Sequence, residues 1–118
     1  TRAEAAVGYA TVDGATCGGL SPIAAIDKAF LREWLCWMEA TGSEDFPPIP
    51  ELSVINAQAP TAELRPLEQT QTDEADLMPY PLLDAIERSA IRDKRAPGGV
   101  RVEMSERFPQ SSVAQLDV

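Results

Sequence analysis

The sequence predicts a mostly α-helical chain, and two observations carry that prediction. Apolar residues recur at helical spacing from Asp27 to about Ala40 and again from Pro79 to about Asp93. No stretch of five or more residues alternates apolar and polar side chains as a half-buried strand does. Ten prolines and seven glycines among 118 residues indicate several short segments rather than one long bundle.

The first 26 residues contain four glycines among small side chains, at positions 8, 14, 18 and 19. This composition predicts an ordered but irregular loop. Such glycines can let the backbone approach a ligand closely, although glycines at irregular spacing more often only make turns. Neither G-x-G-x-x-G nor G-x-x-x-x-G-K-[ST] occurs, so neither of these nucleotide-binding fingerprints is present.

The clearest expected helix covers residues 27–41. Asp27 suits its N-cap, and Gly42 suits the stop that follows it. Lys28, Arg32, Glu33 and Glu39 take the polar side. The apolar residues fall on one arc of roughly 160°, which predicts a core face rather than a platform for stacking bases. They are Phe30, Leu31, Trp34, Leu35, Trp37 and Met38.

Four segments follow. A short helix is expected over residues 50–57, with Pro50 in its first turn. Residues 60–78 form a polar loop that opens with PTAEL and carries the acidic cluster Asp73, Glu74 and Asp76. We expect a solvated loop whose acids favour the N-terminus of the next helix. That helix covers 79–93, and a helical C-terminal segment covers 94–118, where Ser112 and Gln115 have capping-box spacing.

Composition excludes several classes of function. The net charge of −9 argues against a non-specific nucleic-acid binder. The chain has no histidine, which removes Ser–His–Asp, Cys–His and the usual zinc sites. The two cysteines, Cys17 and Cys36, do not form a disulfide framework. Cys36 is expected to be a spectator rather than a reactive thiol, since only Arg32 supplies a nearby cation.

No apolar run approaches the about 18 residues of a membrane-spanning helix, and no signal peptide is visible. A capping box with only three residues after it, and an opening without a leader, lead us to expect a piece of a longer protein.

Two residues are candidates for chemistry. Lys28 lies in the first turn of its helix, where a cation opposes the macrodipole unless a phosphate lies over the helix start. Glu4 could bind Mg²⁺ together with phosphate oxygens, because Mg²⁺ often takes only one or two carboxylates from a protein. Position alone favours a solvated side chain in both cases.

Two blocks of sequence resemble the C-terminal part of NAD⁺ synthetases, especially the glutamine-dependent kind. The blocks are TRAEAAVGYATVDGATCGGLSPIAAIDK and PTAELRPLEQTQTDEADLMPYPLLDAI. The family typically shows N-[KR]-[ST]-E-x-x-x-G-Y-x-T, then Y-G-D-x-x-G-G and P-[IL]-x-x-[IV]-x-K. Further on come [PA]-[TS]-A-E-L-x-P and Q-[TS]-D-E-x-D-L-x-[PT]-Y. The resemblance covers about residues 1–93, and two blocks in the right order are more specific than either alone.

The resemblance implies an α/β parent, with an adenine-nucleotide α-hydrolase-like parallel sheet and flanking helices, of which this chain is a mostly helical part. Such ligases use ATP and Mg²⁺ to adenylylate deamido-NAD⁺, and ammonia then displaces AMP to give NAD⁺. A separate amidase domain makes the ammonia from glutamine. The resemblance also implies a cytoplasmic homo-oligomer without nucleic-acid or membrane partners.

By position in the motifs, Lys28 and Thr61 correspond to residues that contact ATP. Glu4 corresponds to the glutamate near Mg²⁺ and deamido-NAD⁺, and Thr11 lies in the segment that lines the deamido-NAD⁺ site. PTAEL and the acidic stretch resemble an active-site loop over the nucleotide. No catalytic residue is assigned.

The sequence departs from the family at Ala15, which stands where the Y-G-D motif has its aspartate. Asp13 is a candidate substitute near deamido-NAD⁺. The S-G-G-x-D-S pyrophosphate loop is absent, so this chain is not expected to catalyse the reaction alone. Two alternatives stay open: a degenerate non-catalytic relative, favoured by Ala15, and an acidic helical interaction module. Without the sheet, the Phe30–Trp34–Met38 face should be uncovered, which predicts low stability and self-association.

Overall fold

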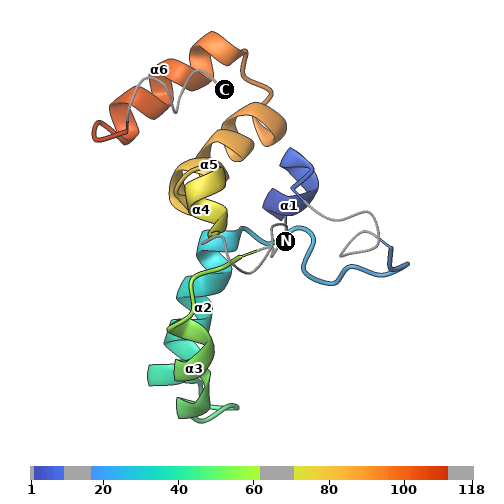
Figure 1. Ribbon diagram of the computed structural model, residues 1–118, viewed down its shortest axis with the longest axis vertical. Coiled ribbons are helices and arrows are strands. Elements are labelled where there is room, and N and C mark those ends of the chain that lie inside the picture. The colour runs from blue at the N-terminus through green and yellow to red at the C-terminus, as the bar shows by residue number, and fades with distance from the viewer. Residues whose placement is uncertain (1, 10–16, 62–70, 112–118) are drawn as a thin grey trace. The chain divides into compact units, whose positions relative to one another are not determined.

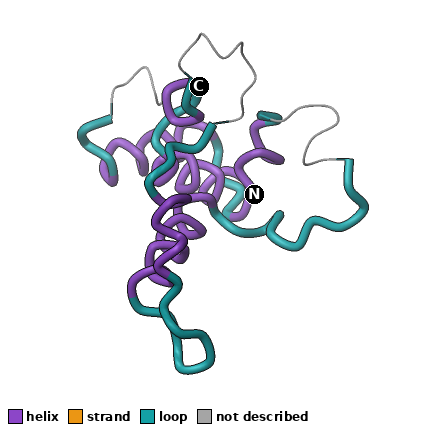
Figure 2. The backbone as a smooth tube through the Cα atoms, turned by 60° about the horizontal axis from the view of Figure 1, so that its bottom comes forward, coloured by secondary structure: helices purple, strands orange, loops and turns teal. Residues whose placement is uncertain are grey.

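The computed structural model describes residues 2–9, 17–61 and 71–111, and within these residues all regular structure is helical (Figure 2). The chain divides into two compact units, Thr1–Asp73 and Glu74–Val118. No helix among the described residues has the length and apolar character that a bilayer crossing requires. The helices are α1 (Arg2–Val7), α2 (Lys28–Ala40), the 3-10 helix η1 (Pro50–Leu52), α3 (Ser53–Asn56), α4 (Asp73–Asp76), α5 (Tyr80–Glu87), the π-helix η2 (Arg88–Arg92) and α6 (Pro97–Arg107).

Helix α1 corrects the expectation of an irregular loop over residues 1–26. Its sequence RAEAAV is rich in alanine, the best helix former, and Glu4 lies in the first turn where a carboxylate favours the helix. Gly8 follows with φ +67°, a left-handed conformation that ends the helix at low steric cost. Local propensity therefore outweighs the glycines that come later in the segment.

Helix α2 lies within the expected range, but its N-terminus is not capped as expected. Asp27 has the extended backbone of an N-cap, and its side chain makes no capping hydrogen bond. Its carboxylate forms an ion pair with Arg2 instead. At the other end Gly42 has φ +66°, and its N–H donates to the Trp37 carbonyl at 3.1 Å, so the expected glycine stop is present.

The chain then reverses, and η1 and α3 return along α2 (Figure 1). Pro50 occupies the first turn of η1, as its position in the sequence predicts. Two hydrogen bonds hold the two arms together: the Ile49 N–H donates to the Met38 carbonyl at 3.0 Å, and the Asn56 amide donates to Glu39 Oε2 at 2.7 Å. The Met38 side chain is buried.

The prediction that the aromatic residues of α2 are core was wrong. Phe30, Trp34 and Trp37 keep 60%, 45% and 42% of their surface exposed. On a helical wheel these three residues lie opposite Lys28, whereas Lys28, Leu31 and Leu35 share a pocket with residues of the returning arm. The uncovered face predicted for the isolated chain is thus confirmed at Phe30 and Trp34, but not at Met38.

In the second unit, α5 begins where its two prolines predict. Pro79 is at the N-cap position, and Pro81 lies in the first turn. Glu74 Oε1 accepts a hydrogen bond from the Tyr80 N–H at 2.9 Å, so one acid of the acidic cluster does serve the start of the following helix. The other part of that prediction, a solvated cluster, is wrong for Asp73, which is buried.

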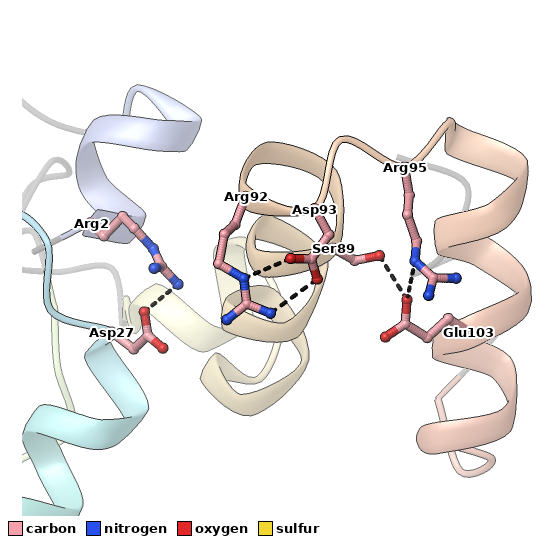
Figure 3. Close-up of polar contacts among 7 residues, drawn as sticks. All are labelled: Arg2, Asp27, Ser89, Arg92, Asp93, Arg95 and Glu103. Atoms are coloured by element: carbon pink, nitrogen blue, oxygen red, sulfur yellow. Dashed lines mark hydrogen bonds and ion pairs between the residues drawn. The ribbon is translucent and has the colours of Figure 1, made fainter.

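Helix α5 continues into η2 and is followed by α6. Leu82, Leu83, Val100 and Met104 form part of the buried core of the chain. Glu103 links the two helical segments: its Oε2 accepts a hydrogen bond from the Ser89 hydroxyl at 2.7 Å and lies 3.5 Å from Arg95 Nε (Figure 3). The proposed capping box at residues 112–115 lies outside the described residues.

Candidate functional site

Two of the residues singled out from the sequence, Lys28 and Glu4, meet in the first unit. Lys28 Nζ lies 3.4 Å from Glu4 Oε1, and both side chains are largely buried, with 19% and 32% of their surface exposed. Burial pushes the pKa of the Glu4 carboxyl upward, but a hydrogen bond with the amino group at the start of the chain and the positive charge of Lys28 outweigh that effect and lower it. Glu4 is therefore a carboxylate at neutral pH, and it offsets the unfavourable placement of Lys28 at a helix N-terminus.

A second pair fixes the same two helix starts relative to each other. The Arg2 guanidinium forms an ion pair with the Asp27 carboxylate, as Figure 3 shows. The Arg2 backbone N–H also donates to the Ile26 carbonyl at 3.2 Å. Arg2 and Asp27 lie close in sequence to Glu4 and Lys28. Their ion pair therefore helps to keep the Glu4 carboxylate next to the Lys28 ammonium.

Lys28 and Thr61, the two residues assigned to ATP by resemblance, line the same pocket. The pocket lies between α2 and the segment from α3 to Thr61, and its volume is about 330 Å³. That volume is within the range of small-molecule sites. The residues that line it are Lys28, Leu31, Arg32, Leu35, Ile55, Asn56, Gln58, Ala59, Pro60 and Thr61.

The described residues on either side of residues 62–70 lie close together. The Asp73 N–H donates to the Pro60 carbonyl at 3.0 Å, so the chain leaves and returns at one point. Near the returning end, the Gln71 amide donates to the Tyr9 hydroxyl at 2.8 Å, which ties the loop to the residue that follows α1 and Gly8. Thr61, just before residues 62–70, therefore lines the pocket, and Gln71, just after them, contacts the chain close to the helix that carries Glu4.

The other residues assigned by resemblance, Thr11 and Asp13, lie outside the described residues, as does Ala15. Among the described residues, no cluster of three or more His, Cys, Asp or Glu side chains could hold a metal ion by itself. Cys17 and Cys36 are both exposed, and neither of these described cysteines is in a disulfide.

Sequence reasoning placed Arg32 on the polar side of its helix but gave it no role in the site. Arg32 follows Lys28 by four residues, so both side chains lie on one face of α2, and Arg32 lines the pocket as well. The i,i+4 spacing was the signal that could have identified it. What the sequence did not reveal was that the returning arm would cover this face rather than the aromatic one.

The chain belongs to the NAD synthase family, whose profile matches residues 1–116. A glutamine-dependent NAD(+) synthetase of Xanthomonas campestris pv. campestris is 38% identical over 72% of this chain and 14% of its own length. The enzyme of the same name from Aquifex aeolicus is 35% identical over 81% of the chain and 15% of its own length. One from Xylella fastidiosa is 41% identical over 72% of the chain and 14% of its own length.

The chain thus spans about one seventh of the length of these curated relatives. No solved structure shows significant similarity to it.

Proposed function

We propose that this chain is part of a glutamine-dependent NAD⁺ synthetase, a ligase. Family membership over nearly the whole chain and the shared name of the curated relatives support the proposal. The whole protein would have an α/β fold, with a parallel sheet and helices on both faces, and this chain would supply helices and loops around its nucleotide site.

The proposed reaction has two steps. The carboxylate oxygen of the nicotinate in deamido-NAD⁺ attacks the α-phosphorus of ATP, which forms an acyl adenylate and releases pyrophosphate. Ammonia, made from glutamine by an amidase domain, then attacks the carbonyl carbon, and AMP leaves as the amide NAD⁺ forms. Both steps depend on positioning and on neutralisation of phosphate charge, for which lysine and hydroxyl groups are suited in a chain without histidine.

The observation that carries the proposal is that Lys28 and Thr61 line one pocket, with Glu4 3.4 Å from Lys28. These residues are far apart in the sequence, and the resemblance assigns them to one active site. We propose that Lys28 and Thr61 bind phosphate oxygens of ATP, the ammonium by charge and the hydroxyl by a hydrogen bond.

Glu4 fits the role of a magnesium ligand that shares the ion with phosphate. Its pKa is lowered, so it presents the ionised oxygen that Mg²⁺ prefers, and a single protein carboxylate is common at such sites. When bound, Mg²⁺ would supply neutralisation of phosphate charge. Glu4, Thr11 and Asp13 remain our candidates for contact with deamido-NAD⁺.

We also propose the remaining partners on the basis of the family. They are the amidase domain, the rest of the synthetase domain and further copies of the protein in a cytoplasmic homo-oligomer.

The test is NAD⁺ formation by the whole protein from ATP, Mg²⁺ and deamido-NAD⁺, with ammonia or glutamine as the nitrogen source. We expect NAD⁺ to form with either ammonia or glutamine as the nitrogen source. Lys28→Ala should reduce kcat/KM by roughly 100-fold with either source, because a charge contact to the transferring group is lost. Arg107→Ala, an exposed arginine of α6, is the control and should retain activity.

A degenerate, non-catalytic relative is the second candidate, and the substitution at Ala15 favours it. If the folded whole protein makes no NAD⁺ from either nitrogen source, this candidate replaces the first. Ala15→Asp would then be the first reversion to examine.

A further inference from the structure

The described residues that line the pocket next to Lys28 carry a net positive charge, although the chain as a whole is acidic. The net charge of the chain is −9. Of the ten described residues that line the pocket, Lys28 and Arg32 are cations, and none of these ten is aspartate or glutamate. Asn56, Gln58 and Thr61 add amide and hydroxyl groups. A concave surface with this lining favours an anion that can also accept several hydrogen bonds.

Arg32 is placed to share that anion with Lys28. Both residues belong to α2, and their side chains leave the helix about 40° apart on its circumference. Each is partly buried against the pocket. Two cations at i and i+4 repel each other along a helix, and an anion between them removes that repulsion.

Arg32 and Lys28 differ in the geometry of their hydrogen-bond donors, which gives Arg32 a distinct part in the site. A planar guanidinium can donate two parallel hydrogen bonds to phosphate oxygens, whereas an ammonium acts as a point charge.

We infer that Arg32 is a second cationic contact to a phosphate group in this pocket, and that this group belongs to ATP. The assignment to ATP rests on the proposed function, since Lys28 and Thr61 share the pocket. The presence of a phosphate-binding pocket rests on its lining alone.

The kinetic test uses the whole protein with Arg32→Ala, Arg32→Lys and the control Arg107→Ala. Arg32→Ala should raise the KM for ATP at least about tenfold, the effect of losing a hydrogen bond to a charged group. The KM for deamido-NAD⁺ should change less than about twofold. Arg32→Lys should recover part of the loss in ATP binding, because lysine keeps the positive charge but cannot donate two parallel hydrogen bonds. Arg107→Ala should match the wild type.

An ATP KM for Arg32→Ala that matches the wild type would overturn the inference while the proposed function stands. A rise in the KM for deamido-NAD⁺ alone would overturn the assignment to ATP. If the wild-type protein makes no NAD⁺, calorimetry with inorganic tripolyphosphate still decides the question. Binding that Arg32→Ala weakens at least about tenfold supports the pocket, and equal binding, or none by the wild type, overturns it.

Discussion

Lys28 Nζ lies 3.4 Å from Glu4 Oε1, and this contact joins the first turn of α2 to α1. A lysine at a helix N-terminus is placed against the helix dipole, and a carboxylate brought from a distant part of the chain corrects that placement. The pair therefore explains how Lys28 is held in place before any ligand binds.

The pair predicts a specific change in acidity. Lys28→Met removes a positive charge beside Glu4 and should raise the pKa of the Glu4 carboxyl, whereas Arg107→Met should leave that pKa unchanged. Carboxyl-carbon NMR titration of the chain would measure both. A Glu4 pKa that stays the same in Lys28→Met would show that the two groups do not interact in solution.

The lowered pKa of Glu4 also makes stability depend on pH. Because the pKa of Glu4 is lower in the folded chain than in the unfolded chain, its stabilisation is present above the unfolded pKa, about 4.5. It is lost as the pH falls through the folded value. Glu4→Gln should therefore cost up to about 1 kcal/mol at pH 7. Urea unfolding should show that difference vanish in acid, and a pH-independent difference would contradict the account.

Gly42 should tolerate no side chain. Its φ is +66°, and an added Cβ would lie 2.7 Å from both the carbonyl carbon of Pro47 and the nitrogen of Pro48, which are backbone atoms. Gly42→Ala should cost roughly 2–4 kcal/mol of unfolding free energy, from backbone strain plus the clash.

Gly8 provides the matched control for Gly42. Its φ is +67°, but an added Cβ would meet nothing within 4 Å. Gly8→Ala should therefore cost only the strain, about 1 kcal/mol. Urea unfolding of the two variants gives the comparison, and equal losses would argue against the close packing of residues 46–48 over Gly42.

Glu74 should stabilise the start of α5. Its carboxylate accepts the Tyr80 N–H at 2.9 Å, and the first N–H groups of a helix have no partner within the helix. Glu74→Ala should cost about 1 kcal/mol, and Glu74→Gln less, since the amide oxygen can still accept the bond. Circular dichroism during urea unfolding would measure both variants. A Glu74→Gln loss as large as that of Glu74→Ala would show that charge, not the hydrogen bond, matters.

The exposed aromatic face of α2 should make the isolated chain associate. Phe30, Trp34 and Trp37 are each more than two-fifths exposed, and such clusters mark surfaces that are covered in an assembly. Sedimentation of the chain should show self-association that a Phe30→Ser, Trp34→Ser double variant reduces. A sharp, concentration-independent melt of a monomer would contradict this prediction.

The sequence was informative where local chemistry decides the structure. Pro50, Pro79 and Pro81 marked helix starts, and Gly42 marked a helix end, because their backbone preferences act without help from the rest of the fold. The motif resemblance placed Lys28 and Thr61 at one site, and both line one pocket.

The sequence failed where tertiary contacts decide. Periodicity predicted that the aromatic residues of α2 would be buried, but it could not show which side of the helix the returning arm would cover. For the same reason Arg32 was left on the polar side without a role. The contact of Asp27 with Arg2, rather than with its own helix, likewise depends on a partner far away in the sequence.

The most direct test of the central claim is exchange of labelled pyrophosphate into ATP by the whole protein, with deamido-NAD⁺ present and no nitrogen source. This exchange isolates the adenylylation step, in which the phosphates of ATP would lie against Lys28. We predict exchange that requires deamido-NAD⁺ and that falls roughly 100-fold in Lys28→Ala. Exchange that is as fast in Lys28→Ala as in the wild type would contradict the assignment of this pocket to ATP.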